Sequence, residues 1–391
     1  MFRLQSKINM GLSLVYFLCL IALIGCAPQS NHFGMVFASL NNAGADIYRM
    51  PNITQDKIEQ LTFTPTVSEK VLLASKNGDK IIFGTGPALL PAQPADLAKE
   101  GLNQIFFLDS DSNKLVNITK VLTGYLLVPK DFGVDWSPDQ KQLVVVTYQM
   151  ANFKFESFLE FMDFEGKNKN DILIPTMGKI PSLTGSAKWS PDGRKFVLTS
   201  EAIGLDQQLQ NPGDALLVFN LESGEIKQLA DYVTNCFSAV WSPTSQQIAA
   251  TCRSVLPNAQ EVLTPLTVRI FNTDNPDRSY ERSAFNPCHD PSWSPDGQRI
   301  AFICDKDKYR KGLFIVNSDG NIIHEVNLGN LGNPIVLENP TWSPDGTQII
   351  YVTGTDTWHE NIYSVTIDGS NNRALTTQSA YYQVVSVYPV P

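Results

Sequence analysis

Trp293-Ser294-Pro295-Asp296-Gly297 is the stretch that decides the fold, because it recurs along the chain in the same frame. Positions 189–193 and 342–346 repeat all five residues, positions 136–140 lose only the glycine, and positions 241–245 keep Trp, Ser and Pro. The five tryptophans stand 53, 52, 52 and 49 residues apart. A period of this size, kept nearly constant, indicates a repeat architecture.

The motif predicts a tight turn between two strands. Proline presets the backbone at the second position of a turn, Ser and Asp bond to nearby amides, and Gly tolerates a positive φ. The motif is followed by β-branched and aromatic runs such as 299–303 and 348–352, which are typical of strands. Each copy is therefore expected to form a hairpin, with the Trp ending its first strand.

A strand count predicts the number of repeats. A second hairpin, built from an apolar pair and a polar turn, occurs seven times, which gives four strands per unit. The Trp-type strand occurs five times, and Val71 to Gly78 keeps its frame with Ala74 in place of Trp. The C-terminal run 383–389 supplies a seventh innermost strand by completing the N-terminal unit, which closes the ring and removes its edges. We expect an all-β, seven-bladed propeller, or six blades if 71–119 is not one.

The repeated motif followed by an apolar strand resembles the propeller repeats of the TolB family, over most of the chain. The small α/β domain that precedes the propeller in TolB has no counterpart here. Similar repeats occur in propellers attached to peptidases and in pectate-degrading lyases, so the resemblance implies the fold and no single function. The repeated tryptophans are expected to pack between adjacent blades.

The N-terminus predicts export and lipidation. Residues 1–25 carry Arg3 and Lys7 before an apolar run that is short for a membrane span, which is typical of a signal peptide. The run ends in Leu23-Ile24-Gly25-Cys26, which resembles a bacterial lipobox and implies cleavage before Cys26 and lipidation of its thiol. By the same resemblance, Ala27 at the next position implies the outer rather than the inner membrane. An ordinary signal peptide or an uncleaved anchor is the alternative.

After the signal peptide at 1–25, the chain is expected to consist of a lipidated tether at 26–33 and one propeller domain at 34–391. The expected location is the bacterial cell envelope, with the protein anchored by lipid and facing the periplasm. The net charge of −9 and the lack of a basic run exclude nucleic acid as an expected partner, because phosphate binding needs clustered Lys and Arg.

The insertions indicate where binding is expected. They all fall between the second and third strands of a unit, so one face carries long loops and the other carries short turns, and binding residues usually lie on loops of a rigid scaffold. Neutral variation in loop length is the alternative. The loop residues predicted to bind are Tyr148, Phe153, Phe155, Tyr309, Arg310 and Trp358.

Four cysteines of the mature chain share one pattern. Cys236 and Cys288 each lie five residues before a motif Trp, while Cys252 and Cys304 each lie eleven after it. A hairpin centred on the motif brings each pair together, and an exported protein permits oxidation. We expect disulfides between Cys236 and Cys252 and between Cys288 and Cys304. Free thiols, pairing between blades and a metal cluster that includes His289 are the alternatives.

Signals for catalysis are sparse. The chain has four histidines, too few for the histidine-rich metal centre of lyase-type propellers, and neither a Gly-x-Ser-x-Gly elbow nor a phosphate-binding glycine loop. No cofactor or metal is expected. The leading hypothesis is a non-enzymatic scaffold that binds an envelope protein or peptide. The alternative is a carbohydrate-binding protein, or a hydrolase or lyase, that uses Asn235, His289 and Asp290 at the mouth of the central tunnel.

Overall fold

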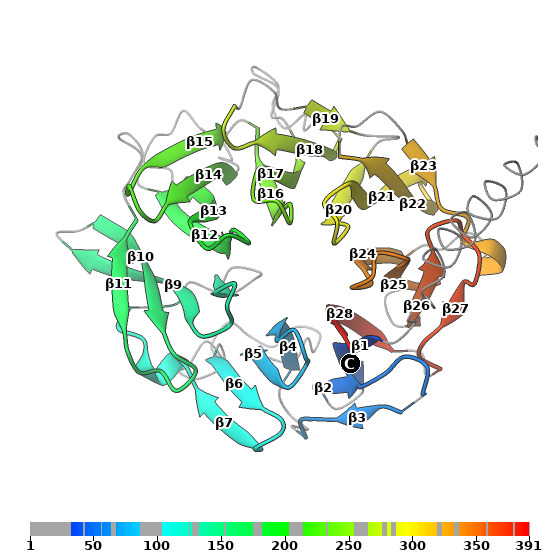
Figure 1. The fold of residues 1–391 in the computed structure, drawn as a ribbon, viewed down its shortest axis with the longest axis horizontal. Coiled ribbons are helices and arrows are strands. Elements are labelled where there is room, and N and C mark those ends of the chain that lie inside the picture. The colour runs from blue at the N-terminus through cyan, green and yellow to red at the C-terminus, as the bar shows by residue number, and fades with distance from the viewer. Residues whose placement is uncertain are drawn as a thin grey trace, which may run out of the picture.

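The computed structural model shows seven four-stranded antiparallel blades around a common axis (Figure 1). It describes residues 33–390 with gaps at turns and connections, the longest at 87–103, 127–132, 175–181, 203–213 and 254–264. Within these limits the helical elements are two 3-10 turns, η2 (Thr119–Val121) and η4 (Gly329–Leu331). In the same residues we find no helix with the length and apolarity that a membrane span requires. The predicted fold class and the seven blades are confirmed.

Blades 1 to 4 contain the N-terminal half of the chain and its last strand. A bridge between Ala45 and Ser68 joins blades 1 and 2 into one eight-stranded sheet. From the axis outward, blade 1 is β28 (Tyr381–Pro389), β1 (Phe33–Asn41), β2 (Gly44–Met50) and β3 (Glu59–Gln60), and blade 2 is β4 (Ser68–Ala74), β5 (Lys80–Gly86), β6 (Gln104–Asp109) and β7 (Lys114–Asn117). Blade 3 is β8 (Val134–Trp136), β9 (Leu143–Ala151), β10 (Lys154–Met162) and β11 (Asn170–Leu173), and blade 4 is β12 (Ser182–Trp189), β13 (Lys195–Ala202), β14 (Asp214–Asn220) and β15 (Ile226–Ala230).

Blades 5 to 7 follow in chain order. Blade 5 is β16 (Cys236–Trp241), β17 (Gln247–Cys252), β18 (Thr267–Asn272) and β19 (Tyr280–Arg282). Blade 6 is β20 (Cys288–Trp293), β21 (Arg299–Asp307), β22 (Arg310–Asn317) and β23 (Ile323–Glu325). Blade 7 is β24 (Val336–Trp342), β25 (Gln348–Gly354), β26 (Glu360–Thr366) and β27 (Arg373–Ala374).

The last strand closes the ring as the sequence predicted. β28 pairs antiparallel with β1, from Phe33 opposite Pro389 to Leu40 opposite Tyr381. Tyr388, near the C-terminal end of β28, is 4% exposed in the core between blades 1 and 2, while Val387 packs against the core between blades 7 and 1. The first and second strands of blade 1 thus come from opposite ends of the sequence, and no motif turn joins them.

The motif residues form the turns that their chemistry predicts. Ser190 and Ser343 donate their hydroxyl hydrogen to the aspartate two residues on, at 2.6 Å in both cases. The divergent copy in blade 2 forms a similar turn, because Ser75 Oγ lies within hydrogen-bond distance of Asn77 Oδ1 (2.8 Å) two residues on and of Asp79 Oδ1 (2.6 Å) four residues on. The frame predicted for blade 2 is therefore confirmed.

The motif tryptophans connect neighbouring blades. The indole N–H of Trp241, Trp293 and Trp342 donates to a backbone carbonyl of the preceding blade, at 2.9, 3.3 and 3.0 Å respectively. The guanidinium of Arg299 in blade 6 lies 4.9 Å from the centre of the Trp342 ring in blade 7. These rings are buried, as large aromatic groups with one polar atom often are. Their recurrence thus has a structural cause.

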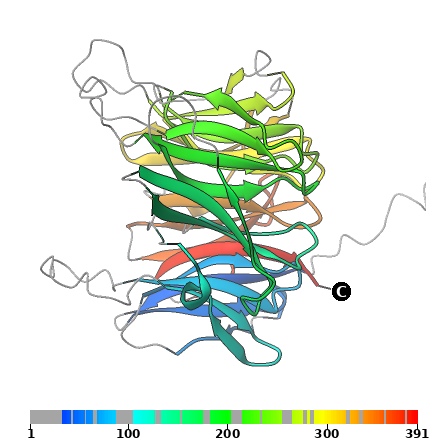
Figure 2. The ribbon, with the colours of Figure 1, turned by 90° about the vertical axis from the view of Figure 1, so that its left-hand side faces the viewer.

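The ring has two faces, which Figure 2 shows edge-on. The turn face carries the motif turns, the turns between third and outermost strands, and the C-terminal end of β28, on the right of that figure. The loop face carries the connections between second and third strands and the starts of the innermost strands. The predicted insertion that contains Tyr148, Phe153 and Phe155 is wrong as a loop, because β9 and β10 continue through most of it and pair as far as Ala151 with Lys154.

Candidate functional site

The loop-face end of blade 6 brings four charged or titratable side chains together. His289 and Asp290 are neighbours in β20, with His289 Nδ1 3.1 Å from Asp290 Oδ2. The other ring nitrogen of His289 lies 3.3 Å from Lys311 Nζ in β22, and Lys311 pairs with Asp305 of β21 at 3.1 Å. A polar chain therefore runs from the innermost strand, beside the axis, to the third strand. We call these four residues the blade 6 polar chain.

A bulge in the innermost strand positions Asp290. Its φ of 55° interrupts the pairing of β20 with β21 between His289 and Ser292. Ser238 and Asn339 stand at the same distance before their motif Trp in blades 5 and 7, with φ values of 51° and 53°. Bulges redirect side chains and recur beside functional sites. The innermost strands of three neighbouring blades thus share a positive-φ residue three positions before the motif Trp.

Asp290 is held as an anion. Its burial acts to raise the pKa, but the hydrogen bond and positive charge of His289, an N–H of Asn339 and the charge of Lys311 outweigh that effect, so the pKa lies below its usual range. His289 Nε2 meets an ammonium group rather than a hydroxyl or thiol of any described residue. The arrangement suits charged hydrogen bonding to a ligand more than activation of a nucleophile.

The hairpin between β21 and β22 places two of the predicted binding residues at the loop-face end of blade 6. Tyr309, at its two-residue turn, is 61% exposed, and Lys308 Nζ lies 5.1 Å from its ring centre. Arg310 begins β22 and forms an ion pair with Asp307. An exposed aromatic ring among charges that are already ordered is typical of a protein-binding surface.

The other predicted site residues fare differently. Tyr148 is wrong as a binding residue, because it lies in β9, is 3% exposed and packs in the core between blades 3 and 4. The alternation of the strand turns its side chain inward. Asn235 precedes β16 and is 9% exposed, so little of its side chain reaches the tunnel mouth. Phe155 belongs to β10 by its backbone, and Phe153 and Trp358 lie outside the described residues, as does Cys26.

Both expected cysteine pairs are disulfides in the structure. Cys236 bonds Cys252, and Cys288 bonds Cys304, each across a directly opposed pair of the first and second strands. The second bond lies one residue before His289 and one before Asp305. It therefore fixes two strands that carry the blade 6 polar chain. Within the described part of the chain, His, Cys, Asp and Glu form no group of three that could hold a metal ion.

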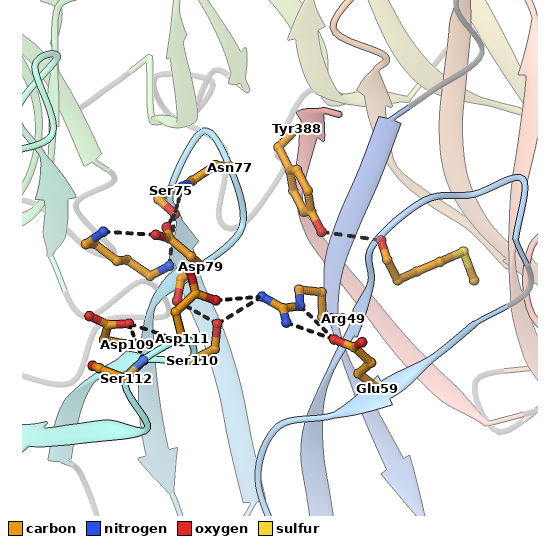
Figure 3. A network of polar contacts seen from close by, with 12 residues as sticks. Arg49, Glu59, Ser75, Asn77, Asp79, Asp109, Ser110, Asp111, Ser112 and Tyr388 are labelled. Atoms are coloured by element: carbon orange, nitrogen blue, oxygen red, sulfur yellow. Dashed lines mark hydrogen bonds and ion pairs between the residues drawn. The ribbon is translucent and has the colours of Figure 1, made fainter. Parts of the chain in front are cut away.

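A second surface was not singled out by the sequence. A cavity of about 540 Å³ opens on the turn face where blade 1 lacks its motif turn, and we call it the seam cavity. Figure 3 shows polar side chains that lie around it. It is lined by Tyr388, Pro389 and Val390 from the C-terminal strand, Arg49 and Pro51 from blade 1, Ser75, Lys76, Asn77 and Lys80 from blade 2, and Gln140 from blade 3.

Most polar groups of the seam cavity are already paired. Arg49 binds Glu59 at 2.8 Å and donates to Ser110 at 2.9 Å (Figure 3). Lys80 pairs with Asp79 at 3.0 Å. Lys76 Nζ, by contrast, is exposed and donates to the Pro138 carbonyl at 3.3 Å, with no carboxylate of a described residue in ion-pair range. The sequence did contain a signal for this cavity. Because the first and second strands of blade 1 come from the two ends of the chain, this blade must lack the motif turn that joins these strands in the other blades.

Comparison with known proteins gives the fold. No protein-family model matches the sequence, and no curated protein matches it. Solved structures that match include one from a study of two prolyl endopeptidases, with 13% identity over 97% of this chain and 56% of that chain, at a TM-score of 0.59. An oligogalacturonate lyase in complex with manganese matches at 12% identity over 88% of this chain and 85% of its own, with a TM-score of 0.55.

TolB from Acinetobacter baumannii is also among the matching structures. It is 14% identical over 90% of this chain and 80% of its own, with a TM-score of 0.45. The prolyl endopeptidase and oligogalacturonate lyase matches, at 13% and 12% identity, show a shared propeller fold and nothing of substrate or partner. Because these two matches are a peptidase and a lyase, the function has to be argued from the site.

Proposed function

We propose that this chain is a lipid-anchored propeller of the bacterial cell envelope that binds another envelope protein or peptide without catalysing a reaction. The blade 6 hairpin carries the proposal. It presents Tyr309 at 61% exposure in the same hairpin as Lys311 and Asp305 of the blade 6 polar chain, at the loop-face end of the blade. An exposed aromatic ring supplies contact area at low entropic cost, while ordered charges supply register and specificity.

The contacts of the described residue His289 support binding over catalysis. Among the described residues, His289 meets Asp290 and Lys311, and its ring reaches no nucleophile that a base could activate. The lipobox at Cys26 and the TolB-like repeat favour an envelope location. Outer-membrane sorting rests on Ala27, which follows the lipidated position.

A direct comparison of ligand classes tests this function. Purified protein is titrated with a panel of cell-wall glycans, and the same protein is used in a crosslinking pull-down from envelope extract. We expect a specific protein adduct that is lost in Tyr309→Ala and Lys311→Ala, and no saturable glycan shift. Tight glycan binding without a protein adduct would instead support the alternative, a carbohydrate-binding site at the tunnel mouth.

A further inference from the structure

The N-terminal end of β1 leaves the propeller on the turn face. Phe33 lies opposite Pro389 in the register of β1 with β28, and Tyr388 and Pro389 line the seam cavity on that face. Phe33 is 1% exposed, and its carbonyl accepts a hydrogen bond from the Ile53 N–H at 2.9 Å. The point from which the preceding chain departs is therefore fixed within the fold.

The chain between this point and the lipidation site is short. Six residues, 27–32, separate Cys26 from Phe33, so even a fully extended backbone reaches only about 25 Å. β1 has nine residues and runs from the turn face to the loop face, a path of about 30 Å at the usual strand rise. A path around the outside also crosses two more strands of blade 1, which adds about 10 Å. The tether is too short to bring the loop face to the lipid.

The turn face has groups that suit a bilayer surface close to this exit. Ile58, just before β3, is 45% exposed, and Leu115 in β7 is 57% exposed. Both lie at the turn-face end of an outermost strand, in blades 1 and 2. Lys76, whose ammonium has no carboxylate partner among the described residues, lies in the motif turn of blade 2. Exposed apolar groups beside an exposed lysine ammonium fit the boundary between headgroups and acyl chains.

We infer that the propeller sits on the membrane with its turn face toward the bilayer, so that the loop face and the blade 6 polar chain point away from it. This inference rests on the lipidation of Cys26 in the proposed function. The short tether sets the orientation, and the seam cavity then lies at the lipid side. A soluble partner reaches the loop face without competing with the membrane.

Fluorescence quenching in vesicles tests the orientation. Lipidated full-length protein is reconstituted into vesicles containing a lipid with a nitroxide-labelled headgroup, and an environment-sensitive dye is attached to one introduced cysteine. Lys141→Cys places the dye on the turn face, where the native side chain is 80% exposed, and Tyr309→Cys places it on the loop face. We expect at least threefold stronger quenching at position 141 than at position 309.

Vesicle flotation of the same samples separates the two claims. Equal quenching at both positions, or stronger quenching at 309, in protein that floats with the vesicles would overturn the orientation and leave the anchor intact. Wild-type protein that does not float would overturn the anchor and the orientation with it. Cys26→Ser is the matched control and is expected to stay with the soluble fraction.

Discussion

Glu360, where blade 7 contacts the closing strand β28, is expected to make the stability of the ring depend on pH. Its side chain is fully buried, and Oε2 accepts the Tyr382 N–H of β28 at 3.0 Å. Oε1 has no hydrogen-bond partner among the described residues. Burial, followed by the charges of Glu338 and Asp356, raises the pKa of Glu360 to about 7 in spite of the Tyr382 N–H.

The sign and size of the effect follow from linkage. Below the ordinary pKa of 4.5, the folded and unfolded states both hold the proton, and the full stability is present. As the pH rises from 4.5 through 7, the unfolded state loses the proton first, so the free energy of unfolding falls. A difference of about 2.5 pKa units corresponds to a loss of about 3 kcal/mol by pH 8.

Glu360→Gln removes this titration while keeping an oxygen for the Tyr382 N–H. Urea unfolding of both proteins, followed by tryptophan fluorescence at pH 4.5, 6 and 8, measures the effect. The free energy of unfolding of the variant should rise relative to that of the wild type as the pH rises. The relative increase between pH 4.5 and pH 8 should be about 3 kcal/mol. Glu222→Gln, at an exposed turn, is the control, and its free energy of unfolding should equal that of the wild type at each pH. A wild-type to Glu360→Gln difference that is the same at all three pH values would show that Glu360 does not couple its titration to folding.

Three further changes test the closure, the disulfides and the anchor. Truncation after Ala380 removes β28 with its buried residues Tyr382 and Tyr388, and it should cause aggregation or lower Tm by about 10 °C or more. A change in Tm within about 2 °C would show that the strand does not close the ring. Replacing Cys288 and Cys304 together by Ala opens a disulfide with a sequence separation of 16 and should lower the free energy of unfolding by about 3 kcal/mol; an unchanged urea midpoint would contradict this. Cys26→Ser should accumulate as an unprocessed or membrane-released form, and a variant that still fractionates with membrane at the mature mass would argue against the lipobox.

The fold could be predicted because the motif residues of each repeat specify the turn between its first two strands. Ser, Asp and Gly at fixed positions specify local hydrogen bonds, so copies such as 189–193 and 342–346 needed no tertiary information. The divergent copy at Ala74 was recognisable for the same reason. Ring closure followed from counting strands, because an unpaired innermost strand must find a partner.

The candidate site was harder to predict, because loop and strand differ by packing rather than by local chemistry. Tyr148 stood in a long insertion, yet the two strands simply continue, and its ring fills the core between blades. His289 and Asp290 were placed correctly at the start of an innermost strand, but their link to Lys311 depends on the register of three strands. The seam cavity depends on the turn missing from blade 1, which no local motif encodes.

Site-specific photo-crosslinking in the envelope tests most directly whether the loop face is the binding surface. A photoreactive amino acid replaces Tyr309 on the loop face or Lys141 on the turn face, both in otherwise wild-type protein. We expect a discrete protein adduct from position 309 that excess unlabelled wild-type protein competes away and excess Lys311→Ala protein does not, with no such adduct from position 141. A competable protein adduct from position 141 alone would show that the loop face is not the binding surface.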